Sequence, residues 1–568
     1  MTKKTEKPMK GCEIVIRCLE RANVDIIFAY PGGQSLELHQ ALQNSSIRVI
    51  LPRHEQGGAF AAGGYARSTG KTGVCMATSG PGATNLVTGI ADAYMDSVPV
   101  VFITGQVPSS LIGRNAFQET DIIGITRPIV KHSYLVLDVK DIPSVFAEAF
   151  KLANSGRPGP VVIDIPKNIQ QAVWAPEFHE ESISRDYDCV RHSVKESDLK
   201  AVKHAISRAK RPCIYAGGGI IISEASRELV KFAESYNIPV TTTIMGIGSI
   251  PEDHPLCLMW LGMHGTVYAN NAANECDLLI GLGVRFDDRV TGPTATFAQD
   301  AKIIHVDIDV SEINKNKKAD IGVVADVKSF LEDLNKEPLY KDYKDWHNQI
   351  AEWKKKFPLK YKVRENAIQP QFVVETLSRL TDGEAIIVTG VGQHQMWAAQ
   401  YYRHKYPRHH ITSGGLGAMG FGLPSAMGVK VACPHKTVVN IDGDGSFQMN
   451  IQELGTIHNE DINVKMIILN NQHLGMVAQW EDRFYGSVRG NTVLINERVN
   501  RPYPDFISIA KGYQIPGREV YTKAEVEDAI KEMLTCKEAF LLDIHTGYQE
   551  HVLPMIPPGK TYKDIIYE

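Results

Sequence analysis

Short, almost continuously apolar segments alternate with helix-length segments along most of this 568-residue chain. In the first third of the chain, helix-length stretches such as 56–68 and 83–95 lie between the apolar segments 24–30, 47–51, 72–78, 99–104 and 160–165. Strands that are apolar on both faces are typical of parallel sheets that helices cover on both sides. The alternation therefore predicts an α/β fold built on doubly wound parallel sheets.

The pattern occurs three times, as expected for a chain too long for one hydrophobic core. Apolar segments recur at 212–217, 239–244, 277–283 and 302–309, and again at 384–390, 437–442, 464–470 and 539–545. Charged stretches separate the three groups. We therefore predict an N-terminal domain over 1–170, a linker over 171–195, a central domain over 196–336, a surface linker over 337–368, a C-terminal domain over 369–548 and a tail over 549–568.

Charge and composition exclude several classes of protein. The formal net charge is -4 with no basic stripe, which argues against a nucleic-acid partner. The chain contains no run of about 18 apolar residues, the length that predicts a membrane span. The basic N-terminus lacks the apolar core of a signal peptide. The nine cysteines form no CxxC pair, which favours reduced thiols. We therefore expect a cytoplasmic protein without a membrane partner.

The strongest chemical signal is a pair of polar motifs, Gly443-Asp444-Gly445-Ser446 and Asn470-Asn471. Each follows a predicted strand, and a predicted helix over 447–460 joins them, so both should lie at the carboxyl ends of neighbouring parallel strands, where ligands bind. The glycines beside Asp444 allow a phosphate to approach the backbone. Because Mg²⁺ prefers oxygen ligands, we expect Asp444, Asn471 and the main-chain carbonyl of His473 to bind it together with a diphosphate. An Asp-Gly pair alone is common in turns, and the two flanking strands are what favour a binding site.

This spacing resembles the signature of the thiamine-diphosphate-dependent enzymes. The resemblance implies that Met419 wedges the cofactor into a bent shape and that the carbonyl of Gly417 accepts a hydrogen bond from its aminopyrimidine ring. It further implies that the diphosphate and its Mg²⁺ are held by two loops, Val391-Gly392-Gln393-His394 and Gly443-Asp444-Gly445-Ser446, together with Asn471.

Glu55 starts a predicted helix directly after a strand. Alone, such a residue usually complements the helix dipole. The resemblance gives it a second role, because a Glu of the first domain hydrogen-bonds the aminopyrimidine ring in this family and promotes activation of the cofactor. There the acid and the diphosphate site come from different subunits, so we expect a homo-oligomer, dimer or tetramer, with active sites at the subunit interface.

Longer segments narrow the resemblance to the acetolactate synthases, and it extends along nearly the whole chain. The segments are 54–67, 116–121, 157–167, 284–292, 470–486 and 550–559. The resemblance implies an FAD that does no net redox work in the reaction. Its expected contacts are Arg157, Gly217, Gly218, Gly219, Met263, His264, Arg285, Asp287, Asp307 and Asp326.

The same resemblance implies a substrate cavity. Arg289 is expected to hold the carboxylate of a 2-keto acid, since a guanidinium recognises carboxylates through two parallel hydrogen bonds; an ordinary surface ion pair is the alternative. Trp480 should shape the pocket for the acceptor's alkyl group. Gly33, Phe117, Gln118 and Lys167 match residues that line this cavity. One departure is Gly113-Arg114-Asn115, where relatives more often carry a threonine-aspartate pair.

The implied reaction is a carboligation. Pyruvate loses CO₂, and its two-carbon remainder is joined to a second pyruvate or to 2-ketobutyrate, the first step of branched-chain amino-acid biosynthesis. A related alternative is another thiamine-dependent 2-keto acid decarboxylase or oxidase such as pyruvate oxidase, against which Arg289, Trp480 and segment 550–559 argue. A nucleotide-binding oxidoreductase would carry GxGxxG in its first βαβ unit, and a non-catalytic homologue would have lost Glu55 or Asp444. In this family a separate small regulatory subunit supplies feedback control, and no such regulatory domain is evident in this chain.

Overall fold

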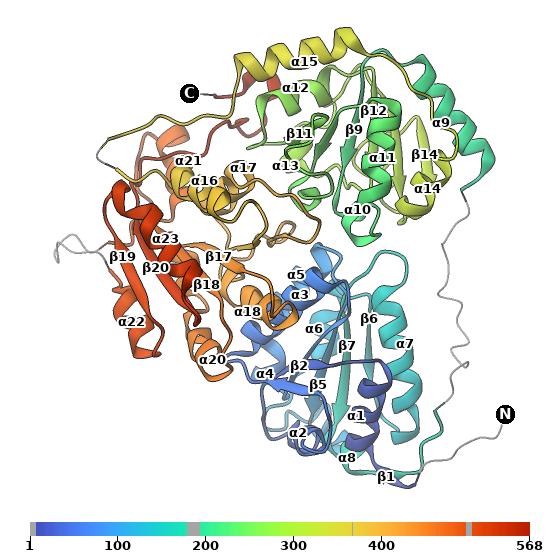
Figure 1. Ribbon diagram of the computed structural model, residues 1–568. Coiled ribbons are helices and arrows are strands. Elements are labelled where there is room, and N and C mark those ends of the chain that lie inside the picture. Colours follow the sequence, from blue (N-terminus) through green and yellow to red (C-terminus); the bar gives the residue numbers. More distant parts are fainter. Residues whose placement is uncertain (1–6, 179–193, 366, 496–502, 568) are drawn as a thin grey trace.

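The computed structural model describes residues 7–178, 194–365, 367–495 and 503–567. Their strands form three six-stranded sheets and one two-stranded ribbon (Figure 1). Every strand pair in the three large sheets is parallel. The predicted fold class, three doubly wound α/β domains, is therefore confirmed.

The N-terminal sheet has the strand order β3-β2-β4-β5-β7-β6. Its strands are β2 (Ile26–Ala29), β3 (Arg48–Ile50), β4 (Gly73–Ala77), β5 (Val100–Gln106), β6 (His132–Leu135) and β7 (Val161–Pro166). The surrounding helices are α1 (Gly11–Arg21), α2 (Leu36–Leu42), α3 (Glu55–Thr69), α4 (Pro81–Thr84), α5 (Val87–Met95), α6 (Ile122–Thr126), α7 (Ile142–Asn154) and α8 (Lys167–Gln171). The short strand β1 (Met9–Lys10) pairs antiparallel with β8 (Val173–Trp174), which ties the two ends of this unit together.

The central sheet has the order β11-β10-β9-β12-β13-β14. Its strands are β9 (Pro212–Ala216), β10 (Val240–Thr242), β11 (Cys257–Trp260), β12 (Leu278–Leu282), β13 (Lys302–Asp307) and β14 (Ile321–Val324). Its helices are α9 (Glu196–Arg208), α10 (Gly218–Ile222), α11 (Ser226–Tyr236), α12 (Val267–Glu275), α13 (Asp288–Thr291) and α14 (Val327–Leu334). The segment predicted as a surface linker, 337–368, contains helix α15 (Lys344–Lys356), and its Trp346 and Ile350 are buried in the central core. Most of the first predicted linker, 179–193, lies outside the described residues.

The C-terminal sheet has the order β16-β15-β17-β18-β20-β19. Its strands are β15 (Ile386–Thr389), β16 (His410–Ile411), β17 (Val438–Gly443), β18 (Lys465–Asn470), β19 (Gly517–Val520) and β20 (Phe540–His545). Its helices are α16 (Pro370–Leu380), α17 (Gln393–Tyr401), α18 (Gly422–Ala432), α19 (Asp444–Gln448), α20 (Leu454–Asn459), α21 (Gly475–Phe484), α22 (Phe506–Gly512) and α23 (Val526–Thr535). The tail then passes back towards the central domain, where the backbone N–H of Ile556 donates to the carbonyl of Met263 over 2.8 Å.

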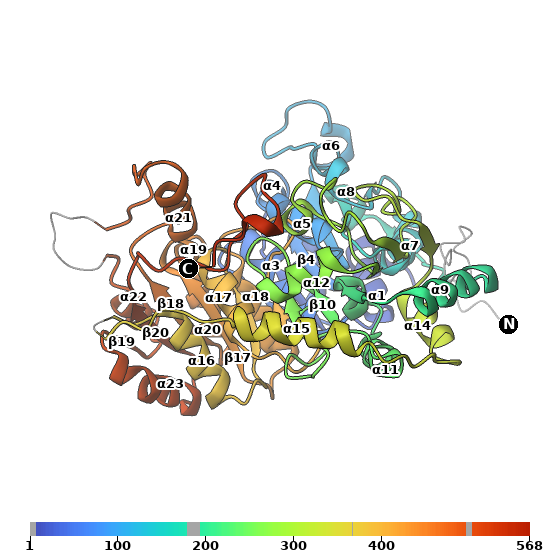
Figure 2. The same cartoon turned by 90° about the horizontal axis from the view of Figure 1, so that it is seen from above.

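The N-terminal and C-terminal sheets share one hydrophobic core. Alternate residues of each strand point to opposite faces, and the residues of one face of both sheets, such as Phe102 and Ile468, belong to the same buried cluster. Helices α3 and α18 cross between the two sheets (Figures 1 and 2). Their approach requires glycine, since a Cβ at Gly64 would lie 2.3 Å from the carbonyl oxygen of Ser425. The two domains therefore form one packed unit.

Five strands of the three large sheets were not predicted from the sequence. They are β6, β11, β14, β16 and β19, and each is the outer strand of its sheet. Four of them bury few residues, since β6 (HSYL) has no fully buried residue and β14, β16 and β19 have one each, whereas β11 (CLMW) is buried throughout. Two predicted helices are also broken. Segment 83–95 divides into α4 and α5, and segment 447–460 divides into the end of α19, a 3-10 turn at Ile451–Glu453 and α20.

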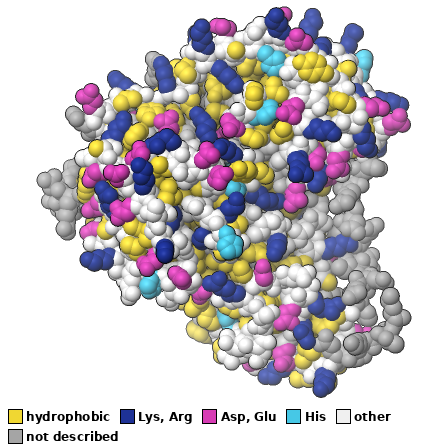
Figure 3. All heavy atoms as spheres, in the orientation of Figure 1, with side chains coloured by type: hydrophobic (Ala, Val, Ile, Leu, Met, Phe, Trp, Pro, Cys, Tyr) yellow, Lys and Arg dark blue, Asp and Glu magenta, His cyan; other side chains and the backbone are white. Residues whose placement is uncertain are grey.

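Basic and acidic side chains are intermixed on the face of the molecule drawn in Figure 3. Among the helices that the structure describes, none is both long enough and apolar enough to cross a bilayer.

Candidate functional site

The two polar motifs of the C-terminal domain lie side by side. Strands β17 and β18 pair in parallel with Gly443 opposite Leu469, so Asp444 and Asn471 leave neighbouring strands at the same edge. The oxygen Oδ1 of Asn471 accepts the backbone N–H of His473 over 3.0 Å, which brings the third predicted ligand residue to the same turn.

The carboxylate of Asp444 is buried without full hydrogen bonding among the described residues. The residue is 2% exposed, and its Oδ2 has no hydrogen-bond partner among the described residues. Burial, with a smaller effect from nearby Asp543, raises the pKa of Asp444 to about 7. A buried carboxylate oxygen without a partner is costly, and a cation beside it would remove that cost. The residues present therefore fit Mg²⁺.

The predicted diphosphate loop adjoins this turn. Gly392 has φ +153° and precedes helix α17, whose first residues are Gln393 and His394. The amide of Asn471 donates to Oε1 of Gln393 over 3.3 Å. His394 packs so closely that a Cβ at Gly443 would lie 2.8 Å from its Nδ1, and burial lowers the pKa of His394 to about 3, which keeps the ring neutral. A helix N-terminus beside an unpartnered carboxylate can hold a phosphate and its cation together.

The loop with Gly417 and Met419 closes another side of this site. Gly417 has φ +69° and faces Val391, while the methyl carbon of Met419 lies 3.7 Å from the Cβ position of Gly445. Two acidic residues of the N-terminal domain hold the loop from behind. Asp96 accepts the N–H of Gly415 over 2.7 Å, and Asp92 accepts the hydroxyl of Ser413 over 2.5 Å.

Both of these aspartates also bind the buried Arg67, at 2.6 Å for Asp92 and 3.1 Å for Asp96. The guanidinium offsets one of the two buried carboxylates, and the hydroxyl and amides of the loop satisfy the remaining acceptors. This triad could not be predicted from the sequence, because its three members are not adjacent in the chain and each resembles an ordinary surface residue of a helix.

A cavity of about 1670 Å³ runs from the central domain to this loop. Nine predicted flavin residues line it, together with Arg289, Val391, Gln395, Gly417, Met476 and Trp480: Arg157, Gly218, Gly219, Met263, His264, Arg285, Asp287, Asp307 and Asp326. Gly217 does not line it, and its place is explained by packing, because a Cβ there would lie 2.1 Å from the carbonyl oxygen of Gly283.

The chemistry of the lining suits a dinucleotide. Asp307 ends β13 and Asp326 follows β14, and carboxylates at strand ends can accept ribose hydroxyls. Burial raises the pKa of Asp307 to about 6 and lowers that of His264 to about 4, so the histidine is neutral at pH 7. Arg157 reaches across from the N-terminal domain and binds Glu312 over 2.7 Å. The residues present therefore fit FAD.

The predicted residues of the N-terminal domain form a separate group. Lys167 donates to the carbonyl of Gly33 over 3.0 Å, and Asn85 donates to Glu55 over 2.9 Å. Gln118 has φ +60° and packs against Gly80, while Phe117 is 86% exposed. None of the described residues that line the large cavity belongs to this group. Within one chain, the predicted active-site residues therefore lie in two separate places, one along the large cavity and one in the N-terminal domain.

The unusual segment 113–115 forms part of a tight loop in front of Phe117. The carboxylate of Glu119 accepts the backbone N–H groups of Gly113 and of Ala116, the latter over 2.8 Å. These hydrogen bonds lower the pKa of Glu119. Asn115 has φ +55°, a conformation that asparagine tolerates well. The carboxylate of Glu119 therefore closes the loop without the threonine-aspartate pair.

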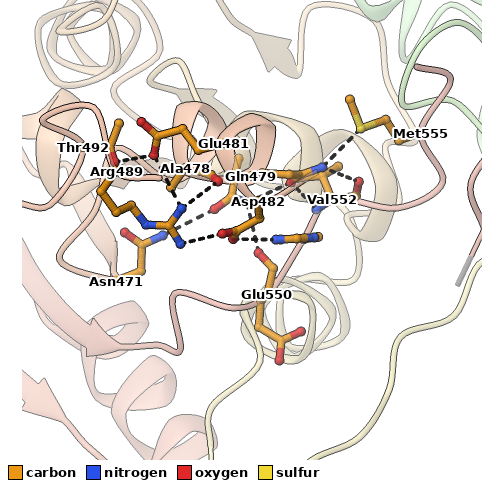
Figure 4. Close-up of polar contacts among 12 residues, drawn as sticks. Asn471, Ala478, Gln479, Glu481, Asp482, Arg489, Thr492, Glu550, Val552 and Met555 are labelled. Carbon is orange, nitrogen blue, oxygen red and sulfur yellow. Dashed lines mark hydrogen bonds and ion pairs between the residues drawn. The ribbon is translucent and has the colours of Figure 1, made fainter. Parts of the chain in front are cut away.

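A further residue of the site, Gln479 on α21, was not predicted. Its side chain is 1% exposed and accepts the amide of Gln393 over 2.9 Å. It also contacts Val552 and Met555 of the tail, as Figure 4 shows. Gln479 thus joins the diphosphate loop to the C-terminal tail. Its place within the predicted motif 470–486, next to Trp480, was the available signal.

Comparison with known proteins identifies the family. Three family models of the thiamine pyrophosphate enzymes match this chain. They are the N-terminal TPP binding domain over residues 9–125, the central domain over 199–334 and the C-terminal TPP binding domain over 390–544. Acetolactate synthase 2, chloroplastic, of Zea mays is 54% identical over 99% of this chain and 89% of its own length. Acetolactate synthase, chloroplastic, of Arabidopsis thaliana is 54% identical over 99% of this chain and 85% of its own length. Because this identity extends through all three domains, the chain belongs to the acetolactate synthase family of thiamine pyrophosphate enzymes.

Proposed function

We propose that this protein catalyses the acetolactate synthase reaction, in which pyruvate loses CO₂ and its two-carbon remainder is joined to a second pyruvate or to 2-ketobutyrate. The proposal rests on the observation that a cation and diphosphate site lies next to a cavity that could hold substrate. The buried Asp444 turn fits a cation with a diphosphate, and the adjoining loop at Gly417 borders the same cavity as Arg289 and Trp480. Among thiamine pyrophosphate enzymes, the family relationship favours this reaction over an oxidase.

Asp444, Asn471 and the carbonyl of His473 would hold Mg²⁺, and residues 391–394 with Ser446 would hold the diphosphate. When bound, thiamine diphosphate supplies a thiazolium ring that accepts the electrons released as CO₂ leaves a 2-keto acid. Met419 would hold the cofactor in a bent conformation, and the carbonyl of Gly417 would orient its aminopyrimidine ring. The large cavity would hold FAD, which takes no net part in the electron balance of the carboligation.

Substrate selection would depend on Arg289 and Trp480. The Arg289 side chain is 65% exposed and lies 3.8 Å from the exposed carboxylate of Asp288, a weak contact that leaves the guanidinium able to bind a substrate carboxylate. The ring of Trp480 packs edge-on against Phe484 at 5.9 Å, which limits its movement. A fixed aromatic wall can discriminate one methylene by about 1–3 kcal/mol, so Trp480 would distinguish a 2-ketobutyrate acceptor from pyruvate.

The active site would be completed by a second copy of the chain. Glu55, Gly33, Gln118 and Lys167 do not line the cavity of their own chain, and Phe117 beside them is 86% exposed. Because these residues are separated from the cofactor loops within one chain, their placement fits a site that a second subunit completes. We therefore propose that Glu55 hydrogen-bonds the aminopyrimidine ring of a cofactor held by the partner subunit.

Two further parts of the proposal concern partners and location. A separate small subunit would supply feedback regulation. The cysteine pattern favours a reducing, cytosol-like compartment, whereas the plant relatives are named as chloroplastic proteins. We propose that the protein works in a reducing compartment, and that it functions in the cytoplasm.

The test is product formation from pyruvate by the purified protein, with thiamine diphosphate, Mg²⁺ and FAD each omitted in turn. Acetolactate is measured after acid conversion to acetoin, alongside oxygen uptake and acetaldehyde release. We expect acetolactate to require all three cofactors without oxygen consumption. Acetaldehyde, acetate or oxygen uptake as the main outcome would overturn the proposal and favour a decarboxylase or an oxidase.

A further inference from the structure

The backbone directly before Glu55 is held by a carboxylate from the other end of the chain. Glu453 lies in the 3-10 turn between α19 and α20 of the C-terminal domain. Its carboxylate accepts the backbone N–H of Arg53 over 3.0 and 3.1 Å and the backbone N–H of His54 over 3.1 Å. These two amides belong to the two residues before Glu55 and lie at the N-terminus of α3. A single side chain therefore holds the turn that presents Glu55.

The contact is buried and leaves little freedom. Glu453 is 0% exposed, and the hydroxyl of Thr456 donates to its Oε2 over 2.8 Å. Burial raises the pKa of Glu453 to about 6, while the Thr456 hydroxyl and the two amides oppose that rise. Among the described residues, the carboxylate accepts hydrogen bonds from two main-chain amides and from the Thr456 hydroxyl, which are groups of fixed position. Such a carboxylate is a rigid anchor rather than a surface charge.

The sequence of α3 accommodates this anchor. A Cβ at Gly57 would lie 2.3 Å from Oε1 of Glu453, so only glycine allows the carboxylate to reach the amides. His54 continues the same turn, because its ring nitrogen Nδ1 accepts the backbone N–H of Gln56 over 3.1 Å. From Arg53 to Gly57 the backbone is thus fixed on both sides of Glu55. The side chain of Glu55 itself contacts Asn85.

A second carboxylate of the same segment provides a comparison. Glu460, at the end of α20, binds Arg48 of the N-terminal domain over 3.2 Å, and the two side chains are 24% and 49% exposed. It connects the same two domains as Glu453 but lies away from the turn at 53–57. General attachment of the domains and orientation of Glu55 are therefore served by different acidic residues.

We propose that Glu453 is a positioning residue, which orients Glu55 for its hydrogen bond to the aminopyrimidine ring by anchoring the amides of Arg53 and His54. The inference rests on the proposed role of Glu55. Glu453 is fully buried and does not line the large cavity, so we assign it no contact with cofactor or substrate. It acts by keeping the Glu55 carboxylate in one place, and small displacements of a group that exchanges a proton reduce the rate strongly.

The test is the rate at which the thiazolium C2 proton of bound thiamine diphosphate exchanges for deuterium, measured by acid quench and NMR on the full-length holoenzyme. Glu453→Gln replaces one acceptor oxygen by an NH₂ group, which cannot accept a hydrogen bond from a backbone N–H. We expect the exchange rate and kcat to fall by roughly ten- to a hundredfold, with the KM for pyruvate, FAD content and thiamine diphosphate affinity close to wild type. Glu460→Gln should exchange at the wild-type rate.

Gly57→Ala is a second variant, which displaces the Glu453 carboxylate without removing its charge and should slow exchange in the same way. Wild-type exchange in both Glu453→Gln and Gly57→Ala would overturn the inference. A loss of exchange matched by an equal loss of cofactor binding would also overturn it, since that pattern indicates only a loss of fold. Glu55→Gln separates the two proposals, because an unchanged exchange rate in that variant would instead refute the assigned role of Glu55.

Discussion

The side chain of Gln479 binds both backbone groups of Val552. Its Nε2 donates to the carbonyl of Val552 over 3.1 Å, and its Oε1 accepts the N–H of Val552 over 2.8 Å. The same Oε1 accepts the amide of Gln393, whose Nε2 also donates to the carbonyl of Glu550. The C-terminal tail is therefore attached to the diphosphate loop by two buried glutamines.

Gln479→Leu should release the tail. The substitution leaves the backbone groups of Val552 and the amide of Gln393 without partners, at a cost of about 1–3 kcal/mol for each buried group. We expect limited proteolysis, followed by mass spectrometry, to cleave within 549–567 faster than in the wild type. The control is Val477→Ala on the same helix, where the side chain is 52% exposed. Equal cleavage rates in all three proteins would contradict the prediction.

Asp444→Asn should remove the cation site. The variant lacks the negative charge that Mg²⁺ needs but keeps nearly the same volume. Titration of Mg²⁺ in the presence of thiamine diphosphate, followed by calorimetry, should show affinity weaker by more than about tenfold. FAD content should not change, because Asp444 does not line the large cavity. An unaltered Mg²⁺ affinity would show that Asp444 is not a ligand.

Neighbouring glycines of α3 should respond in opposite ways to alanine. A Cβ at Gly64 would lie 2.3 Å from the carbonyl oxygen of Ser425, whereas a Cβ at Gly63 meets nothing within 4 Å. Gly64→Ala should lower stability by about 1–3 kcal/mol through overpacking. Gly63→Ala should raise stability by up to about 1 kcal/mol, since alanine favours the helix. Thermal unfolding of the two variants measures this, and a Gly64→Ala protein as stable as the wild type would refute the close packing of α3 on α18.

Asp164 should make the N-terminal domain less stable as the pH rises. Burial on β7 raises the pKa of Asp164 to about 7, although hydrogen bonds from Thr104 and Gln106 oppose the shift. The folded chain therefore keeps this proton between about pH 4 and pH 7, where the unfolded chain has lost it. The contribution of this proton to the free energy of unfolding is complete below about pH 4. It decreases by at most about 1.4 kcal/mol per pH unit until about pH 7.

Asp164→Asn removes that titration. The Tm of the variant minus that of the wild type should therefore increase from pH 5 to pH 7 and level off by pH 8, as measured by differential scanning fluorimetry. Asp528→Asn, at an exposed position of α23, is the control and should show a constant difference. A difference for Asp164→Asn that does not change with pH would show that the carboxyl is already ionised in the fold.

The places of several site residues followed from local pattern alone. Apolar strands end at Gly443 and at Asn470, and because parallel neighbours end at the same edge, Asp444 and Asn471 were expected to lie together. The structure has them on adjacent strands. In the same way the glycine-rich segment 54–67 predicted a helix that begins beside Glu55. These features were predictable because burial on both faces of a sheet leaves a continuous apolar signature in the chain.

The amino-acid sequence by itself determined the three parallel sheets, their inner strands and the polar motifs at the strand ends, since each depends on periodicity within a few residues. Only the tertiary structure decided the outer strands such as β6 and β19, which bury less of their surface and so lack that signature. It also decided the contacts of Glu453 with Arg53 and of Asp96 with Gly415, which join residues some 400 and 319 positions apart. Such pairs form only when whole domains pack together, and no local pattern records which distant backbone amide a buried carboxylate will meet.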